Sequence, residues 1–147
     1  MEIIMEIREI KKSEMKDAMS LVWKVFLEFE APDYTEEGIQ EFKKCITDET
    51  WLNTRKHYGY FDNDKLCGVI STKDTTHIAL FFVLGELHGK GIGRKLYNYI
   101  KKLNKTNHFT VNSSPYAKEI YHHMGFTDTA GEQCINGLRF IPMECYF

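Results

Sequence analysis

The sequence predicts an α+β fold, an α/β sandwich in which a mixed, mostly antiparallel sheet of six to seven strands is flanked by about four helices. Two observations support this prediction. Apolar residues recur with helical spacing in four segments, and between those segments they form short runs typical of strands. The chain has 147 residues and contains no repeat or linker-like tract, which predicts a single domain over residues 1–147.

The first part of the chain predicts one strand and then two helices. Residues 5–10 alternate between apolar and polar side chains, as a half-buried strand does. Ser13 is the expected N-cap of the first helix, which ends near Pro32 because proline cannot continue it. A second, shorter helix runs from Thr35 to Ile46, with its apolar residues on one face.

After these helices the pattern changes to that of strands. Residues 57–61 and 66–72 flank a polar turn, which predicts an antiparallel pair. The apolar run over 76–84 is short enough to be a strand buried on both faces. A helix is predicted over 92–103, where apolar residues line one side.

The last part predicts one strand, one helix and two closing strands. The strand covers 108–111. Ser114 is the expected N-cap of the helix, and Gly125 lies just past its end. The closing strands lie near 126–129 and 138–147.

Composition excludes several classes of protein. Hydrophobic residues make up 43% of the chain, too many for a disordered protein, and the formal net charge of −2 argues against a nucleic-acid binder. The longest apolar run, 78–84, is far shorter than the roughly 20 residues that span a bilayer, so we expect no membrane partner. The start, at Met1 or Met5, lacks a signal-peptide pattern, and a cytoplasmic protein is expected. The four cysteines lack metal-ligand spacing, so no metal is expected.

One segment indicates chemistry: the buried strand is followed by His88-Gly89-Lys90-Gly91-Ile92-Gly93-Arg94, which opens a helix. Glycines allow close approach of the backbone to a ligand, and the free amides of a first helical turn attract anions. A phosphate or pyrophosphate site is therefore predicted, although a plain glycine-rich turn would look similar. The spacing fits neither a Walker loop nor a Rossmann loop.

The segment resembles the acetyl-coenzyme A loop of the GNAT (Gcn5-related N-acetyltransferase) superfamily, Gln/Arg-x-x-Gly-x-Gly/Ala, with His88 in place of the first residue. A second family segment, Asn-x-x-Ala-x-x-x-Tyr-x-x-x-Gly-Phe, is similar to the stretch from Asn112 to Phe126, with Ser114 where many relatives have the Asn. Both motifs occur in the family's order. The chain is identified as a small, single-domain, bacterial-type member of this superfamily.

The resemblance implies acetyl-CoA as co-substrate. In the family, pantetheine lies between two splayed strands and the glycine loop holds the pyrophosphate. The implied cofactor residues are on the fourth strand, on the loop and after the fifth strand: Phe81, Phe82, Val83, His88, Gly89, Lys90, Gly91, Ile92, Gly93, Arg94, Asn112 and Ser114. For Ser114, a plain N-cap role is an equally good interpretation.

The resemblance also implies a direct attack of an amine on the thioester. Val83 N–H is the expected donor to the oxyanion, and Tyr121 matches the family's general acid, although it could instead be a core residue. His77 aligns with the base of the histone-acetylating branch. Other candidates for the base or for binding the acceptor lie between the first two helices: Glu28, Glu30, Asp33 and Tyr34.

The expected reaction is therefore acetyl transfer from acetyl-CoA to the primary amine of a small molecule or peptide. One alternative is a coenzyme A-binding sensor or regulatory module with the same fold but no catalysis. Another is a nucleotide-binding protein that uses the same loop. The net charge of −2 slightly favours a cationic acceptor, and a homodimer is possible because relatives often dimerise.

Overall fold

The computed structural model describes residues 4–147, so a start at Met1 lies outside the described residues. The strands are β1 (Met5–Glu9), β2 (Lys56–Asp62), β3 (Lys65–Lys73), β4 (His77–Val83), β5 (His108–Ser113), β6 (Thr127–Asp128), β7 (Gln133–Ile135) and β8 (Leu138–Tyr146). The α-helices are α1 (Met15–Val25), α2 (Glu36–Thr47), α3 (Glu49–Asn53), α4 (Ile92–Leu103) and α5 (Lys118–His123). In this part of the chain, no helix has the length and apolar character needed to cross a membrane.

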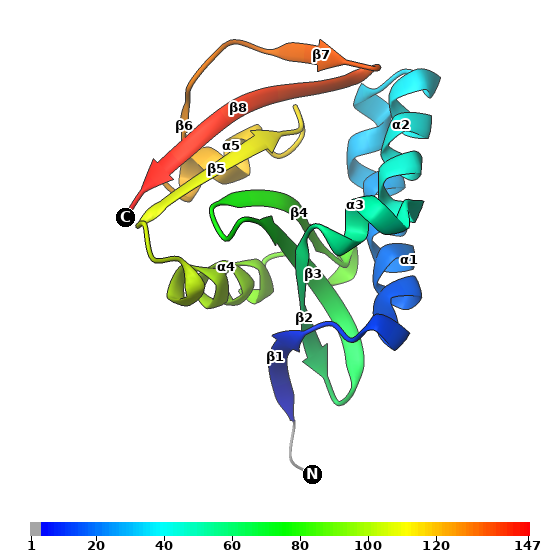
Figure 1. Ribbon diagram of the computed structural model, residues 1–147, viewed down its shortest axis with the longest axis vertical. Helices are drawn as coiled ribbons and strands as arrows, with labels where there is room; N and C mark the ends of the chain where they lie inside the picture. Colours follow the sequence, from blue (N-terminus) through cyan, green and yellow to red (C-terminus); the bar gives the residue numbers. More distant parts are fainter. Residues whose placement is uncertain (1–3) are drawn as a thin grey trace.

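The strands form one sheet in the order β1-β2-β3-β4-β5-β8-β6, with β7 paired to β8 (Figure 1). The β4–β5 pair is parallel and the others are antiparallel, so the predicted mixed α+β fold is confirmed. Two elements were not predicted. β7 has three residues and α3 has five, which is too short for either to show a periodic pattern.

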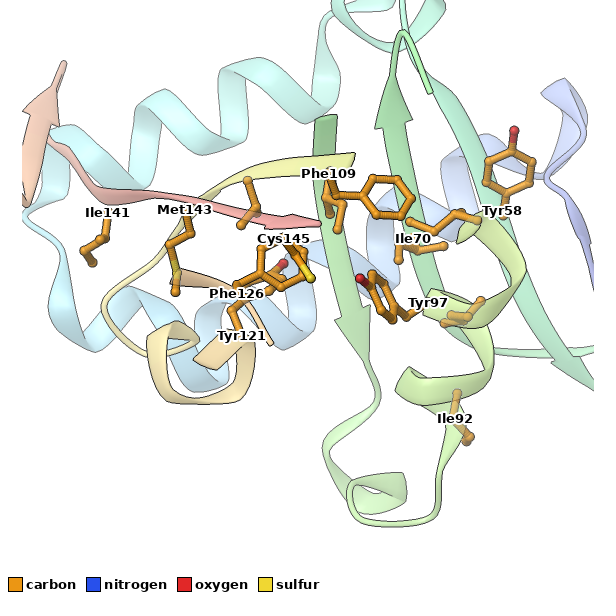
Figure 2. Packing of buried hydrophobic residues seen from close by; sticks show 14 of the residues in the cluster. Tyr58, Ile70, Ile92, Tyr97, Phe109, Tyr121, Phe126, Ile141, Met143 and Cys145 are labelled. Atoms are coloured by element: carbon orange, nitrogen blue, oxygen red, sulfur yellow. The ribbon is translucent and has the colours of Figure 1, made fainter. Parts of the chain in front are cut away.

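Helices cover both faces of the sheet. α1 and α2 enclose one core with buried Phe26, Val69 and Phe82, whereas α4 and α5 lie over a second core that includes Ile70 and Phe109. Neighbouring strand residues such as Val69 and Ile70 contribute to opposite cores because side chains alternate along a strand. Figure 2 shows the second core, where tyrosines from α4 and α5 point toward the sheet.

The start of α1 differs from the prediction. Ser13 lies in a 3₁₀ turn, Lys12–Glu14, and is not the N-cap of the helix. Glu14 is the residue before α1, but its side chain makes no capping hydrogen bond to that helix; its carboxylate instead accepts the Lys11 N–H at 2.9 Å, at the start of the 3₁₀ turn. The 3₁₀ turn places the first α-helical residue, Met15, two positions after Ser13, and a single cap-forming residue does not fix a helix boundary to that precision. The second predicted cap agrees better with the structure. Ser114 Oγ accepts the Ala117 N–H at 3.1 Å, just before α5.

β4 is the strand that divides the sheet. It pairs with β5 only at His77 and Ile78. In its register with β3, Ala79 has no partner, which is a β-bulge that bends the strand away from β5. The prediction that this strand is buried on both faces is wrong, because Ile78, Leu80 and Phe82 are buried but the alternate residues are only half-buried.

The turn between β7 and β8 contacts α2 through two glycines. A Cβ on Gly38 would collide with the backbone carbonyl of Gly137. We expect Gly38→Ala to destabilise the protein by about 1–3 kcal/mol and to lower Tm by roughly 3–10 °C, although alanine normally favours a helix. Thermal unfolding would measure this. Gly131→Ala is the control, since a Cβ there has no atom within 4 Å. Equal Tm values for the two variants would contradict the contact.

Candidate active site

The glycine segment forms an open cradle before α4. Gly89 and Gly91 have φ angles of +79° and +85°, and no atom lies within 4 Å of a Cβ built on either. Gly91 is the N-cap of α4, so the amides of the following turn have no partners inside the helix. Lys90 and Arg94 are exposed beside these amides. Backbone amides, a helix N-terminus and two cations at one place favour a phosphate-bearing ligand.

Beyond the bulge, β4 has a free backbone edge. The Leu84 N–H donates to the Cys67 carbonyl of β3 at 3.0 Å. Bonding residues alternate along an antiparallel pair, so the amide of Phe82 also faces β3. The amides of Phe81 and Val83 face the opposite side, where β5 has diverged. An extended ligand could pair with this edge as an added strand does.

His88 stabilises the end of that edge. Its Nε2–H donates to the carbonyl of Val83 at 2.8 Å, and its ring lies 4.8 Å from that of Phe29. The carbonyl of Val83 is therefore occupied, and its N–H is the group left to donate to a ligand.

Two cavities meet at this edge. The first, which we call the glycine-loop cavity, has a volume of about 310 Å³ and is lined by His88, Gly89, Gly91 and the residues of β4 from Phe81 to Val83. The second, the central cavity, has a volume of about 450 Å³ and extends among α2, α3, β4, β5 and β8. Five residues line both cavities: Glu30, Phe81, Phe82, Ala117 and Tyr121.

Tyr121 comes to this junction from α5 and is 5% exposed. The centre of its ring lies 6.3 Å from that of Phe81 and 5.3 Å from that of Phe126. Figure 2 shows Tyr121 and Phe126 side by side in the core. Burial raises the pKa of the Tyr121 phenol above its usual range, and the charge of Glu30 adds to this rise. The hydroxyl therefore stays protonated at neutral pH and can donate a hydrogen bond or a proton.

Glu30 comes to the same junction from the opposite side. It ends a π-helical turn, Phe26–Glu30, that follows α1. Such widened turns are common at functional sites because they re-aim side chains. Burial raises the pKa of Glu30 to about 7, the charge of Asp33 adds to the rise, and a hydrogen bond from the Ser114 side chain opposes it. A carboxyl group with this pKa can accept a proton near neutral pH.

The geometry agrees with the comparison to known families. A sequence model described as acetyltransferase (GNAT) domain matches residues 30–147. The chain belongs to the GNAT family.

Solved structures support the fold of this GNAT protein. A GCN5-related N-acetyltransferase from Rhodopseudomonas palustris aligns with a TM-score of 0.82 at 19% identity, covering 97% of this chain and 95% of that one. PaiA N-acetyltransferase from Thermoplasma acidophilum, in complex with coenzyme A, aligns with a TM-score of 0.78 at 20% identity, covering 98% of this chain and 99% of that one. Spermidine N-acetyltransferase from Vibrio cholerae, in complex with CoA and spermine, aligns with a TM-score of 0.62 at 16% identity, covering 97% of this chain and 95% of that one. A search of curated protein sequences gives no significant match.

His77, the other candidate base of this GNAT protein, lines the central cavity but not the glycine-loop cavity. Its Nδ1 and the Thr110 hydroxyl are hydrogen-bonded at 2.8 Å. Burial lowers the pKa of His77 below its usual range, and the charges of Arg55 and Lys73 lower it further. His77 is therefore neutral at pH 7, but it lies on only one side of the junction.

Of the other predicted acceptor and cofactor residues, some line the central cavity and others line neither cavity. Asn112, Ser114 and Tyr34 line the central cavity, and the Tyr34 hydroxyl donates to the Arg139 carbonyl at 3.1 Å. Glu28 is exposed and lines neither of the two cavities. Within residues 4–147, no cluster of three or more His, Cys, Asp or Glu side chains could hold a metal ion.

Sequence reasoning missed one side of the central cavity. Glu41 and Cys45 of α2 line it, together with Trp51 and Arg55, which lie on and just after α3. Each pair is spaced by four residues, which brings side chains together on a helix. The spacing in α2 was visible in the sequence, but α3 was not predicted, so Trp51 had no assigned place.

Proposed function

We propose that this protein is an N-acetyltransferase that transfers the acetyl group of acetyl-CoA to a primary amine. The observation that supports it best is the junction of the two cavities. There a partly buried carboxyl group, Glu30, and a buried phenol, Tyr121, lie beside the free edge of β4. A cofactor in the glycine-loop cavity would meet an acceptor in the central cavity between these two groups.

The residues present fit coenzyme A. The Gly89–Gly91 cradle is free of side-chain atoms, and the α4 amides with Lys90 and Arg94 would hold a pyrophosphate. The free edge of β4 at Phe81 and Val83 would pair with the amide groups of a pantetheine arm.

Bound acetyl-CoA would supply a thioester whose acyl carbon can be attacked by an amine. Glu30 in its ionised form would take a proton from the acceptor ammonium, which makes the nitrogen nucleophilic. The N–H of Val83 would donate to the thioester carbonyl oxygen as negative charge develops on it. Tyr121 would donate its proton to the leaving sulfur and regain one from the nitrogen of the tetrahedral intermediate, which must lose a proton to become the amide.

Glu30 is preferred over His77 as the base because it lines both cavities. Removal of a proton from a lysine-like amine at pH 7 costs about 4–5 kcal/mol, so a base at the junction has a large effect. A pKa of about 7 also leaves a large share of Glu30 ionised near neutral pH. His77 lies farther along the central cavity, where it could contact the acceptor.

A thermal-shift series with acetyl-CoA, coenzyme A, ATP and NAD tests the cofactor. Ligand at 100 times its Kd adds about 2.7 kcal/mol, which should raise Tm by roughly 5–10 °C. We expect this shift with the two coenzyme A species and not with ATP or NAD. A shift with ATP or NAD alone would contradict the proposal and favour a nucleotide-binding protein. A shift with coenzyme A but no thiol release with any amine would favour the non-catalytic sensor.

A further inference from the structure

The part of the central cavity that lies beside α2 and α3 contains two oppositely charged side chains, Glu41 and Arg55. Neither lines the glycine-loop cavity. Both are close enough to Cys45 for their charges to act on its thiol. Within residues 4–147, neither side chain forms an ion pair with the other or with any other group.

Arg55 is held in place but is not neutralised. Its Nη1 donates to the Trp51 carbonyl at 3.0 Å and to the Thr54 hydroxyl at 2.8 Å. The guanidinium lies 3.9 Å from the centre of the Trp51 ring. Its Nε is buried and has no hydrogen-bond partner in the described part of the chain. A buried charged donor without a partner is costly, so a ligand that accepts its hydrogen bond would be strongly favoured.

Glu41 contains a buried acceptor atom without a hydrogen-bond partner. Its Oε2 is buried and, among residues 4–147, has no hydrogen-bond partner. A carboxylate oxygen in this state favours a ligand that carries an ammonium or another strong donor. The lining of the central cavity therefore includes one carboxylate and one guanidinium, each with a buried atom that lacks a hydrogen-bond partner among residues 4–147.

We propose that Glu41 and Arg55 form a subsite for a zwitterionic head group, the ammonium and carboxylate of an α-amino acid. Glu41 binds the α-ammonium and Arg55 binds the α-carboxylate. The acetylated amine is a second one, at the far end of the acceptor side chain, where it reaches Glu30 and Tyr121. The inference rests on the proposed function and adds the acceptor class, a diamino acid such as lysine or ornithine. A polyamine lacks the carboxylate and would place a cation beside Arg55.

Pairs of acceptors that differ only in the carboxylate test this directly. Thiol release would be measured with 2,4-diaminobutyrate, ornithine and lysine, each against the diamine with the same chain but no carboxylate. For the chain length that fits, we expect kcat/KM to be at least about tenfold higher for the amino acid. A diamine that is as good as its amino acid at every length would overturn the proposal.

Two isosteric variants test whether Arg55 and Glu41 are the residues that discriminate the amino acid from its diamine. Arg55→Gln and Glu41→Gln should each lower the ratio of kcat/KM between the amino acid and its diamine by about tenfold or more. Arg139→Gln is the matched control, because this guanidinium lines the same cavity but is already bonded to Glu132 and to the Asp33 carbonyl. It should leave the ratio unchanged. If Arg55→Gln lowers kcat/KM equally for both acceptors, its role is structural and the subsite is wrong.

A binding measurement separates this inference from the proposed reaction. The chain has two tryptophans, so Trp23→Phe leaves Trp51, which lies against Arg55, as the single reporter. Lysine or ornithine should change the fluorescence of Trp51 saturably, and Arg55→Gln should abolish the change. If this occurs without any acetyl transfer, the subsite is supported and the proposed function fails. If transfer occurs but the amino acids cause no saturable change, the subsite is overturned and the proposed function remains.

Discussion

Glu30→Gln should lower kcat/KM for the acceptor at pH 7 by about 100-fold or more, which is the usual contribution of a general base. Glutamine keeps the size of the side chain and its ability to hydrogen-bond Ser114, but it cannot take a proton. The comparison uses steady-state thiol release with a saturating concentration of acetyl-CoA. Because removing a proton from a lysine-like amine at pH 7 costs about 4–5 kcal/mol, this substitution should have the largest effect of those considered.

The pH profile distinguishes a base from a residue that only binds. Burial raises the pKa of Glu30 to about 7, so the ionised form increases as pH rises through 7. We expect kcat of the wild type to rise over this range and the rise to be absent in Glu30→Gln. Glu28→Gln, on the same turn but outside both cavities, should keep the wild-type profile. If His77→Gln removes the rise and Glu30→Gln does not, His77 is the base.

Glu30→Gln should lower turnover but should raise the stability of the protein above neutral pH. The pKa of Glu30 is higher in the folded protein than in the unfolded chain, so the folded state binds the proton more tightly. Stability therefore falls as pH rises from about 4.5 to 7, and the penalty is fully present above that range. Glutamine carries no charge to desolvate, so Glu30→Gln should raise Tm at pH 8 and have little effect on Tm at pH 4. A substitution that stabilises the protein while reducing turnover is typical of a residue retained for function.

Backbone features of the site could be predicted from the sequence. Glycine spacing before a helix is sufficient to predict an anion cradle, because glycines and free amides supply the geometry without specific side chains. Gly89 and Gly91 have the positive φ angles that such a cradle requires. Tyr121 was identified through its place in a family motif, and the structure places it at the junction of the two cavities.

The remainder of the site depends on burial and on packing between distant segments. Glu28, Glu30 and Tyr34 were equivalent candidates in the sequence, and only the π-helical turn separates exposed Glu28 from Glu30. Arg55 was not among the candidates, because the neighbouring helix α3 is too short to be predicted from the sequence. The bulge at Ala79, which opens β4, depends on the register with β3, and that register is not visible in a single strand.

Tyr121→Phe should lower kcat at least about tenfold and leave the Kd for acetyl-CoA essentially unchanged. Phenylalanine preserves the contacts of the ring with Phe81 and Phe126, so the substitution removes only the proton donor. Tyr97→Phe is the control: it removes another buried hydroxyl from the same core, on α4 (Figure 2). Unchanged kcat in Tyr121→Phe would remove Tyr121 from the proposed mechanism.

The identity of the leaving group tests the step that we assign to Tyr121. The thiol of coenzyme A has a pKa near that of a free thiol, about 8.5, so the departing sulfur gains from a proton donor. A more acidic thiol leaves without needing a proton donor, so the loss of kcat caused by Tyr121→Phe should be smaller with a thioester of such a thiol. Burial raises the pKa of Tyr121, so its phenol stays protonated and this pattern should not change between pH 6 and about pH 9. An equal deficit with both thioesters would mean that the hydroxyl positions the acceptor and does not protonate the sulfur.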